Sequence, residues 1–266
     1  MRNKAPKGVS RMRIAISEKL REIESKEHVK IIMAVESGSR AWGFESPDSD
    51  YDVRFIYVHS KEEYLRLDEV RDVIEWQLDD VLDMTLKDAV GNTLVKYDDV
   101  LDINGWDVKK ALQLLYKSNP TVFEWRASPI IYRGSAEFER LKELLPVYFS
   151  KKKGLYYYLH MAETNYREYL KTDEVRIKKY FYVLRPLLAA KWILDYNCPP
   201  PMLFSELMRE ELDAALKSEV DRLLKMKREF PEMGVAPRVQ ILNDYIECTM
   251  EMIKKKADET STKSQN

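Results

Sequence analysis

The chain has 266 residues, of which 45% are hydrophobic and 33% are charged, and its formal net charge is −1. No apolar run reaches the roughly 18 residues of a membrane-spanning helix, and the basic N-terminus lacks the apolar core of a secretory signal. Because the two cysteines, Cys198 and Cys248, have no metal-like spacing, we expect a reduced, cytoplasmic protein.

The charges are unevenly distributed along the chain, although their sum gives no sign of a nucleic-acid partner. Residues 60–108 hold fourteen acidic and five basic side chains. Residues 150–192 hold ten basic and four acidic side chains, with nine aromatic residues between them. This asymmetry is compatible with an acidic metal-binding half that faces a basic, phosphate-binding half. Two solvated faces of opposite charge would give the same pattern.

The first 130 residues predict a mixture of helices and strands. Amphipathic spacing indicates a helix over residues 11–27, and a β-branched apolar run indicates a buried strand over residues 29–37. The next expected elements are a strand at 52–58, a short helix at 61–67 and a strand at 71–77. The motif DDVLD then occurs twice, at 79–83 and 98–102, either by local duplication or by chance in an Asp-rich region.

From residue 107 onward the pattern is helical. Asp107 is a candidate N-cap for the first helical stretch, which Asn119-Pro120 interrupts. Further helices are expected at residues 135–149, 153–171, 174–196 and 237–256. The sequence therefore predicts an α/β (α+β) half with a mixed sheet at residues 1–130, an all-α domain at residues 131–257 and a disordered tail at residues 258–266.

One segment of the α/β half, VESGSRAWGFESPDSDYDVRFIYV, predicts a reaction site. Gly38 has no Cβ and lets the chain approach a ligand closely, while Ser39 adds a hydroxyl donor for a phosphate. Asp50 and Asp52 lie two residues apart, so on a strand they point to the same face. Two such carboxylates repel each other unless a cation lies between them, and Mg²⁺ binds carboxylates together with substrate phosphates. The pattern therefore predicts metal-dependent phosphoryl or nucleotidyl transfer.

The same segment resembles the nucleotidyltransferase superfamily of DNA polymerase beta. The superfamily pattern is a hydrophobic residue, Gly and Gly or Ser, followed after a gap by Asp, a hydrophobic residue and Asp or Glu. Here it reads Gly38-Ser39, ten residues, and Asp50-Tyr51-Asp52. Together with LDINGWDVKKALQLL, NPTVFEW, SPIIY and IKKYFYVLRPLLAAKWI, the segment looks like the RNA-repair-associated predicted nucleotidyltransferases of this superfamily. The resemblance implies a nucleotidyltransferase-like mixed sheet followed by helices.

The resemblance also implies a third carboxylate on a neighbouring strand, which completes the metal site and serves as general base. We choose Asp102, which would bind metal with Asp50 and Asp52, because it lies in strand-like sequence that resembles the family. Asp107 is the alternative, with helix capping as its competing role, and Asp83 in the repeated motif is another candidate.

Basic and aromatic side chains are expected to contact the nucleotide. Arg40 could hold a phosphate through two hydrogen bonds or pair with a neighbouring acid. Lys178, Tyr182 and Arg185 are spaced to share one face of a helix. The resemblance implies that this face binds nucleotide, with Lys178 or Lys179 on the triphosphate and Tyr182 against the base or sugar. A solvated helix face would have the same spacing.

The expected activity is a Mg²⁺- or Mn²⁺-dependent transfer of NMP from an NTP to an acceptor hydroxyl, with release of pyrophosphate. The resemblance favours an RNA end as the acceptor, and the basic, aromatic-rich residues 150–192 lean the same way. The alternatives are the same chemistry on a protein or small molecule, and a nucleotide-binding module without turnover. The intact pair of Asp50 and Asp52 argues against the last alternative. The sequence does not specify an oligomeric state.

Overall fold

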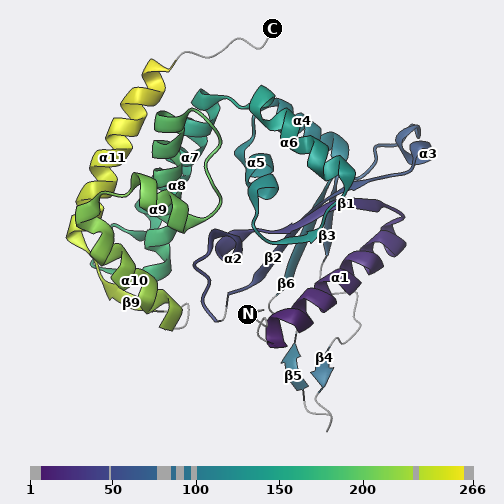
Figure 1. Ribbon diagram of the computed structural model, residues 1–266, viewed down its shortest axis with the longest axis horizontal. Coiled ribbons are helices and arrows are strands. Elements are labelled where there is room, and N and C mark those ends of the chain that lie inside the picture. The colour runs from purple at the N-terminus through teal and green to yellow at the C-terminus, as the bar shows by residue number, and fades with distance from the viewer. Residues whose placement is uncertain are drawn as a thin grey trace, which may run out of the picture.

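The structure is a computed structural model in which a half built on a β-sheet lies beside a helical half (Figure 1). It describes residues 7–47, 49–76, 85–87, 93–96, 101–229 and 234–260. Asp83 and most of the repeated DDVLD motif lie outside the described residues. Among the described helices, none combines the length and the apolar character that a membrane crossing requires.

A mixed sheet of five strands forms the centre of the first half, in the order β3-β6-β2-β1-β7. Its strands are β1 (Lys30–Glu36), β2 (Tyr51–Val58), β3 (Val73–Trp76), β6 (Leu101–Asp107) and β7 (Ile131–Arg133). β2 runs parallel to β6, and the other neighbouring pairs are antiparallel. The predicted strands at 29–37, 52–58 and 71–77 are confirmed as β1, β2 and β3. The strand β6 was indicated only by the strand-like sequence around Asp102, and β7 is an addition to the prediction. A separate antiparallel pair consists of β4 (Thr85–Lys87) and β5 (Thr93–Lys96).

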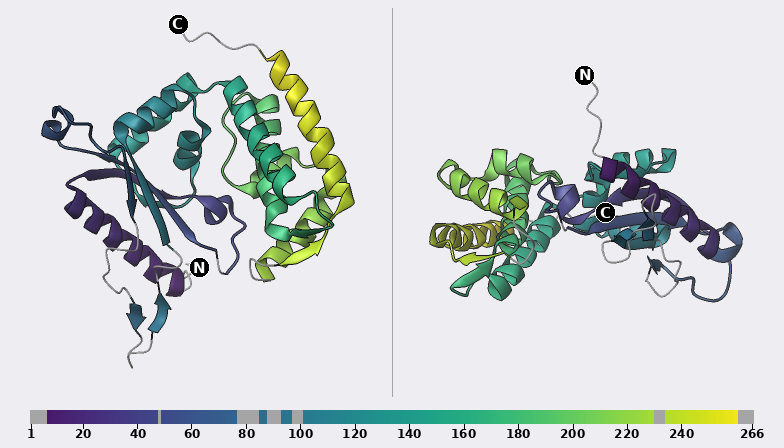
Figure 2. Two further views of the ribbon diagram at one scale, coloured as in Figure 1. Left: turned by 180° about the vertical axis from the view of Figure 1, so that it is seen from behind. Right: turned by 90° about the horizontal axis from the view of Figure 1, so that it is seen from below.

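Helices pack on both faces of the five-stranded sheet, as Figure 1 and the two views in Figure 2 show. α1 (Lys7–Glu27) packs on the face that carries Val53 and Phe55 of β2. The opposite face packs against α4 (Val108–Tyr116), α5 (Pro120–Ala127) and α6 (Ala136–Tyr148). Because side chains alternate along a strand, Asp52 and Arg54 share this second face with the buried Ile56. The site side chains therefore lie on the face opposite α1.

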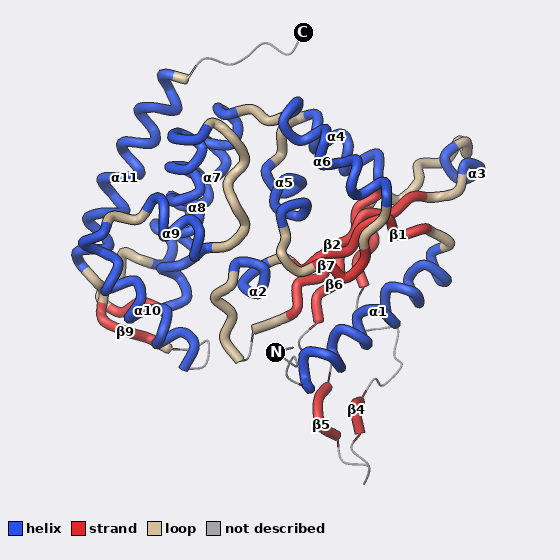
Figure 3. The backbone as a smooth tube through the Cα atoms, in the orientation of Figure 1, coloured by secondary structure: helices blue, strands red, loops and turns tan. Residues whose placement is uncertain are grey.

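In the helical half the other helices surround α8 (Figure 3). Most of the side chains of α8 are buried. Its helices are α7 (Lys151–Tyr169), α8 (Ile177–Tyr196), α9 (Phe204–Glu211), α10 (Lys217–Glu229) and α11 (Gln240–Glu259). The helices α7, α8 and α11 are predicted from the sequence, whereas α9, α10 and the 3-10 turn at Ala214–Leu216 are not. The predicted start of α8 is residue 174. That helix begins instead at Ile177, because β8 (Glu174–Arg176) pairs with β9 (Val235–Pro237) in a small ribbon.

The connection from β1 to β2 joins the two halves. It contains α2 (Gly38–Trp42), whereas α3 (Lys61–Tyr64) follows β2 at the far end of the sheet. Trp42 and Phe44 pack into the core of the helical half, and the Phe44 ring lies 5.3 Å from that of Phe181 on α8. Lys227 Nζ of α10 donates a hydrogen bond of 2.8 Å to the Phe44 carbonyl. The Gly-Ser turn is thus fixed between the sheet and the helices.

Two predicted boundaries differ from the packing in the structure. The predicted α/β half ends at residue 130, yet β7 pairs with β1, and Phe138 of α6 packs on the sheet. The helical half therefore begins with α7. At the other end, residues 258 and 259 belong to α11 rather than to a tail, and residues 261–266 lie outside the described residues. The division into independent domains stays a prediction.

Candidate active site

The turn after β1 requires glycine for two independent reasons. Gly38 has a φ of +60°, a left-handed conformation that costs little only for glycine. A Cβ atom at this position would lie 1.9 Å from Oδ2 of Asp52. The Asp52 side chain therefore packs directly against the turn, and the amide of Ser37 donates to the Asp52 carbonyl at 2.8 Å. The turn and the second Asp of the motif form one unit, as the sequence predicts.

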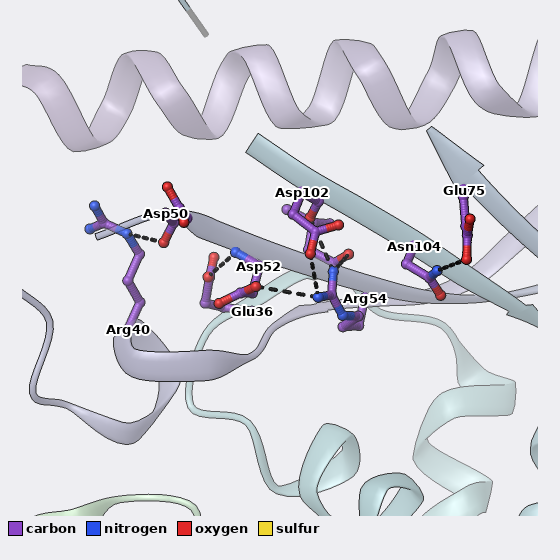
Figure 4. Close-up of polar contacts among 9 residues, drawn as sticks. Glu36, Arg40, Asp50, Asp52, Arg54, Glu75, Asp102 and Asn104 are labelled. Carbon is purple, nitrogen blue, oxygen red and sulfur yellow. Dashed lines mark hydrogen bonds and ion pairs between the residues drawn. The ribbon is translucent and has the colours of Figure 1, made fainter. Parts of the chain in front are cut away.

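The parallel pairing of β2 and β6 brings two of the predicted acids side by side. Asp52 is the register partner of Asp102, and Arg54 is the register partner of Asn104 (Figure 4). Arg54 lies between the two carboxylates, with Nη2 2.7 Å from Asp102 Oδ2 and 3.3 Å from Asp52 Oδ1. The cation beside this pair of acids is thus supplied by the protein itself.

Asp50 lies next to this cluster, one residue before β2 begins, and its side chain is exposed. Burial raises the pKa of Asp52, and the neighbouring charge of Arg54 opposes that shift. The negative charges of Asp102 and Asp50 also raise the pKa of Asp52. Asp102 and Asp50 are therefore both close enough to Asp52 for their negative charges to act on its carboxylate.

Asp107, the alternative third acid, lies at the other end of β6. Five residues separate it from Asp102, which corresponds to about 17 Å along a strand. Its side chain caps α4 by accepting from the Lys109 amide at 2.7 Å, and it also accepts from the Tyr64 hydroxyl at 2.6 Å. Asp107 is buried. These hydrogen bonds show that Asp107 acts as a helix cap. Of the two candidates for the third acid, Asp102 is the one that lies beside Asp52.

Glu36 is a buried acid beside the site that the sequence analysis does not single out. Its side chain accepts a hydrogen bond of 2.7 Å from the Asp52 amide and another from the Tyr132 hydroxyl of β7. Burial raises the pKa of Glu36 to about 7. A carboxylate at the end of the apolar run KIIMAVE was the signal that could have identified it. Through its hydrogen bond with the Asp52 amide, Glu36 fixes the backbone of Asp52.

Arg40 binds the backbone of the loop that precedes β2. Its Nη2 donates to the Ser49 carbonyl at 2.6 Å and its Nε to the Asp50 carbonyl at 3.0 Å. The guanidinium also lies 3.7 Å from the centre of the Tyr51 ring. These contacts hold the loop against α2, beside the half-buried Ser39. The predicted contacts of Arg40 and Ser39 with phosphate stay predictions.

The predicted nucleotide-binding side chains of α8 are placed in different surroundings. Lys178, Lys179 and Tyr182 are half-buried, whereas Arg185 is buried, so Lys178, Tyr182 and Arg185 do not form one exposed face. The Tyr182 ring lies 6.1 Å from the ring of Trp42 in α2, edge to face. Contact through Trp42 therefore brings this part of α8 next to the helix that carries the Gly-Ser turn. Their predicted contacts with nucleotide stay predictions.

Arg185 forms a buried ion pair across the junction of the two halves. Its Nη1 lies 2.9 Å from Glu124 Oε1 of α5, and the same carboxylate oxygen accepts from the Tyr158 hydroxyl of α7 at 2.8 Å. The guanidinium also lies 4.5 Å from the Trp42 ring. Side chains of four helices, α2, α5, α7 and α8, thus meet at this ion pair. Sequence spacing places Arg185 on a helix face but cannot show that this face is covered.

The donor set of the site suits a divalent cation such as Mg²⁺, because carboxylate oxygens are the ligands that such hard ions prefer. Asp52 and Asp102 share one face of the sheet, and Asp50 lies close to them. Within the described part of the chain, however, no three Asp, Glu, His or Cys side chains are grouped closely enough to hold one ion. Arg54 lies in the space between the two facing acids. The side chains are of the type that coordinates such an ion, but in this structure they are not grouped to coordinate it.

The comparison with protein families agrees with the resemblance found in the sequence. The model of the RNA repair pathway DNA polymerase beta family (RlaP) matches residues 12–90 and 91–266. The uncharacterized protein YcgL of Bacillus subtilis (strain 168) is 42% identical over 250 residues, which is 93% of this chain and 89% of that protein. A crystal structure of a nucleotidyltransferase-like protein from Exiguobacterium sibiricum 255-15 matches at 14% identity over 92% of this chain and 75% of that chain, with a TM-score of 0.32. The chain belongs to the RNA repair pathway DNA polymerase beta family.

Proposed function

We propose that the protein transfers the NMP group of an NTP to an acceptor hydroxyl beside the Gly38 turn. One observation carries the proposal: the Asp52 carboxylate packs against Gly38, and Asp102 is its register partner on β6. A triphosphate held at the turn would therefore lie next to the acids that the transfer requires. Membership of a polymerase beta-type family supports the same chemistry.

The reaction has a simple balance of bonds and protons. The acceptor oxygen forms a bond to the α-phosphorus, and the bond from that phosphorus to the bridging oxygen of the β-phosphate breaks. Pyrophosphate leaves, and the hydroxyl proton passes to a base. Asp102 is suited to accept this proton, because its side chain is 58% exposed and lies beside Asp52. Asp52 itself is positioned by Gly38 and by the buried Glu36.

Asp50, Asp52 and Asp102 would hold the divalent cation, Mg²⁺ or Mn²⁺. A bound ion of this kind neutralises charge on the triphosphate and lowers the pKa of the attacking hydroxyl. Gly38 and Ser39 would contact the β- and γ-phosphates, because glycine allows the backbone to approach them closely. This division of roles leaves the protein mainly to position its substrates, which is the principal requirement of nucleotidyl transfer.

The NTP and an RNA end are the substrates that we propose. The family description, an RNA repair pathway, supports RNA as the acceptor. Lys178, Lys179 and Tyr182 are suited to contact the nucleotide, because Tyr182 touches Trp42 of the helix that carries the turn. The aromatic run of α7 gives less support for RNA stacking, because Tyr158 is buried against Glu124.

The proposal is tested by incubating the protein with each α-labelled NTP, with Mg²⁺ or Mn²⁺, and with RNA oligonucleotides that end in a free 3′-hydroxyl. We expect label to become attached to RNA, and the double variant Asp50→Asn, Asp52→Asn to lose transfer while it keeps its folded circular dichroism spectrum. Asp68→Asn is the matched control, because this acid is 85% exposed and lies outside the site.

Other outcomes distinguish the alternatives. Label on a protein or small molecule would retain the chemistry and overturn the RNA acceptor. Nucleotide binding without transfer to any acceptor would overturn the enzymatic proposal. Full activity in the double variant would overturn the assignment of the site.

A further inference from the structure

Arg54 takes the position that a bound cation would need. Its guanidinium makes four polar contacts with the site: Nη2 reaches the carboxylates of Asp102 and Asp52, and Nη1 donates to the carbonyls of Val53 at 3.1 Å and Asp102 at 3.2 Å. The Arg54 side chain is only 19% exposed. An Arg held by two carboxylates and two carbonyls is a built-in counter-ion, which offsets the repulsion between the acids.

The guanidinium and a divalent cation cannot both lie between these acids. Arg54 Nη2 is 2.7 Å from Asp102 Oδ2 and 3.3 Å from Asp52 Oδ1. A Mg²⁺ ion that both oxygens ligate would lie about 2.0–2.1 Å from each of them, in the space that this nitrogen occupies. The two cations would also repel each other at such short range.

The same face of the sheet offers Arg54 a third carboxylate, that of Glu75. Asn104 is the register partner of Arg54 on β6 and of Glu75 on β3, so the three residues form one row across neighbouring strands. Asn104 Nδ2 donates to Glu75 Oε1 at 3.3 Å (Figure 4). Because strands lie about 4.8 Å apart, Glu75 is two strand spacings from Arg54, within the combined reach of the two side chains.

We propose that Arg54 is a displaceable internal cation: it occupies the carboxylate pair before metal binds, and a divalent ion enters only as Arg54 moves toward Glu75. This inference rests on the proposed function, because it takes Asp52 and Asp102 as metal ligands. Arg54 is then a positioning residue that sets the affinity of the site for metal. Without metal, Arg54 holds the two carboxylates together. A metal ion can bind them only when Arg54 exchanges these two partners for Glu75.

The test is the affinity for Mn²⁺ in the absence of nucleotide, measured by electron paramagnetic resonance of free Mn²⁺ and by isothermal titration calorimetry. Arg54→Ala removes the competing cation and should bind Mn²⁺ about five- to tenfold more tightly than the wild type. Arg54→Lys keeps the charge with a single donor group, and its affinity should fall between the two. Arg66→Ala, which removes an exposed arginine of a surface pair, should leave the affinity unchanged.

A double-variant cycle tests the role of Glu75. Glu75→Gln removes this third carboxylate and should weaken Mn²⁺ binding about two- to threefold, because Arg54 then loses its alternative partner. In the Arg54→Ala background the same change should have no effect. An equal effect in both backgrounds would show that Glu75 acts only through its own charge, and would overturn its assignment as the receiving group.

The outcomes separate this inference from the proposed function, because turnover does not enter the measurement. If the wild type and Arg54→Ala bind Mn²⁺ with equal affinity, the inference is overturned and the proposed function is left intact. Tighter binding by Arg54→Ala without any nucleotidyl transfer by the wild type would support the inference and contradict the function. Absence of Mn²⁺ binding in both proteins would overturn the metal site and the inference together.

Discussion

Two arginine–carboxylate clusters in this protein contain the same chemical groups in opposite surroundings. Arg54 pairs with Asp52 and Asp102 at the open end of the sheet, where the three side chains are 19%, 29% and 58% exposed. Arg185 pairs with Glu124 between the two halves, where the side chains are 2% and 11% exposed. The first cluster belongs to the proposed reaction site, and the second joins the helices that surround the turn.

The two clusters differ in how easily their ion pairs can break, because water reaches one cluster far more than the other. An ion pair that water reaches contributes at most about 1 kcal/mol to stability, so its members can exchange partners. A buried pair is costly to break, because the remaining charge is left without compensation in a poorly solvated place. The first arrangement suits a site that must admit a ligand. The second suits a fixed junction that holds α2, and with it the Gly-Ser turn, against α8.

The largest predicted effect is on the buried cluster. Arg185→Met leaves the Glu124 carboxylate without its cation and should lower the free energy of unfolding by about 3–5 kcal/mol. Chemical denaturation of the two proteins measures this difference. The double variant Arg185→Met, Glu124→Leu should recover part of the loss, because neither charge is then left alone.

Arg66→Met is the matched control for Arg185→Met. Arg66 pairs with Glu63 at the surface, where the two side chains are 56% and 40% exposed. This variant should change the free energy of unfolding by less than about 1 kcal/mol. Equal effects of the two substitutions would contradict the distinction between the buried and the exposed clusters.

The next effect concerns Glu36, a buried acid whose described partners are the Asp52 amide and the Tyr132 hydroxyl. Burial raises the pKa of Glu36 from 4.5 to about 7. Between pH 4.5 and about pH 7, Glu36 is therefore protonated in the folded protein and ionised in the unfolded chain. The contribution of Glu36 to stability is therefore complete below the lower value and declines as pH rises through the higher one. The decline should amount to about 3 kcal/mol.

Glu36→Gln tests this dependence, because the glutamine side chain stays neutral and has no proton to release in this pH range. Urea denaturation of both proteins, from below pH 4.5 to above pH 7, should show a smaller decline in the variant. Parallel curves for the two proteins would indicate that Glu36 does not keep its proton in the fold.

A smaller effect follows from the tight contact behind the turn. Gly38→Ala imposes a left-handed conformation on alanine and places its Cβ against the Asp52 carboxylate, so we expect a loss of about 1–3 kcal/mol in stability. Nucleotidyl transfer should fall as well, because Asp52 must move. Gly134→Ala is the control, since the nearest atom to its Cβ would lie at an ordinary 3.8 Å. Similar stability and transfer in the two variants would refute the close packing of turn and acid.

The smallest stability effect is expected from the exposed cluster itself. Arg54→Ala should change the free energy of unfolding by less than about 1 kcal/mol, because water screens the two carboxylates that it leaves behind. Thermal or urea denaturation without metal provides the measurement. A loss as large as that of Arg185→Met would mean that Arg54 is a structural member of the fold and not an exchangeable cation.

Local patterns in the sequence were sufficient to predict β1, β2 and β3 and to single out Asp50 and Asp52. The alternation of Val53 and Phe55 with Arg54 fixes which face of β2 carries Asp52, and glycine at the end of an apolar strand marks the turn. Asp102 was identified through the family resemblance, and the parallel register of β2 and β6 places it beside Asp52.

Features that depend on contacts between distant segments were not predicted. The pairing of Arg54 with Asp102 follows from a strand register, which sequence spacing does not contain. The burial of Arg185 depends on α2, α5 and α7 covering one side of α8, so helical spacing alone placed it on an open face. The strand β7 has only three residues and gains its stability from β1. Glu36 was different, since an acid at the end of an apolar run was visible in the sequence.

The position of the label in the NTP provides the most direct test of the central claim. Wild-type protein and the single variant Asp52→Asn are incubated with the acceptor and either α-labelled or γ-labelled NTP. Transfer of label from the α-position only, together with release of pyrophosphate and loss of both in the variant, is the result that we predict. Transfer of the γ-label, or α-transfer that survives in Asp52→Asn, would contradict nucleotidyl transfer at the Gly38 turn.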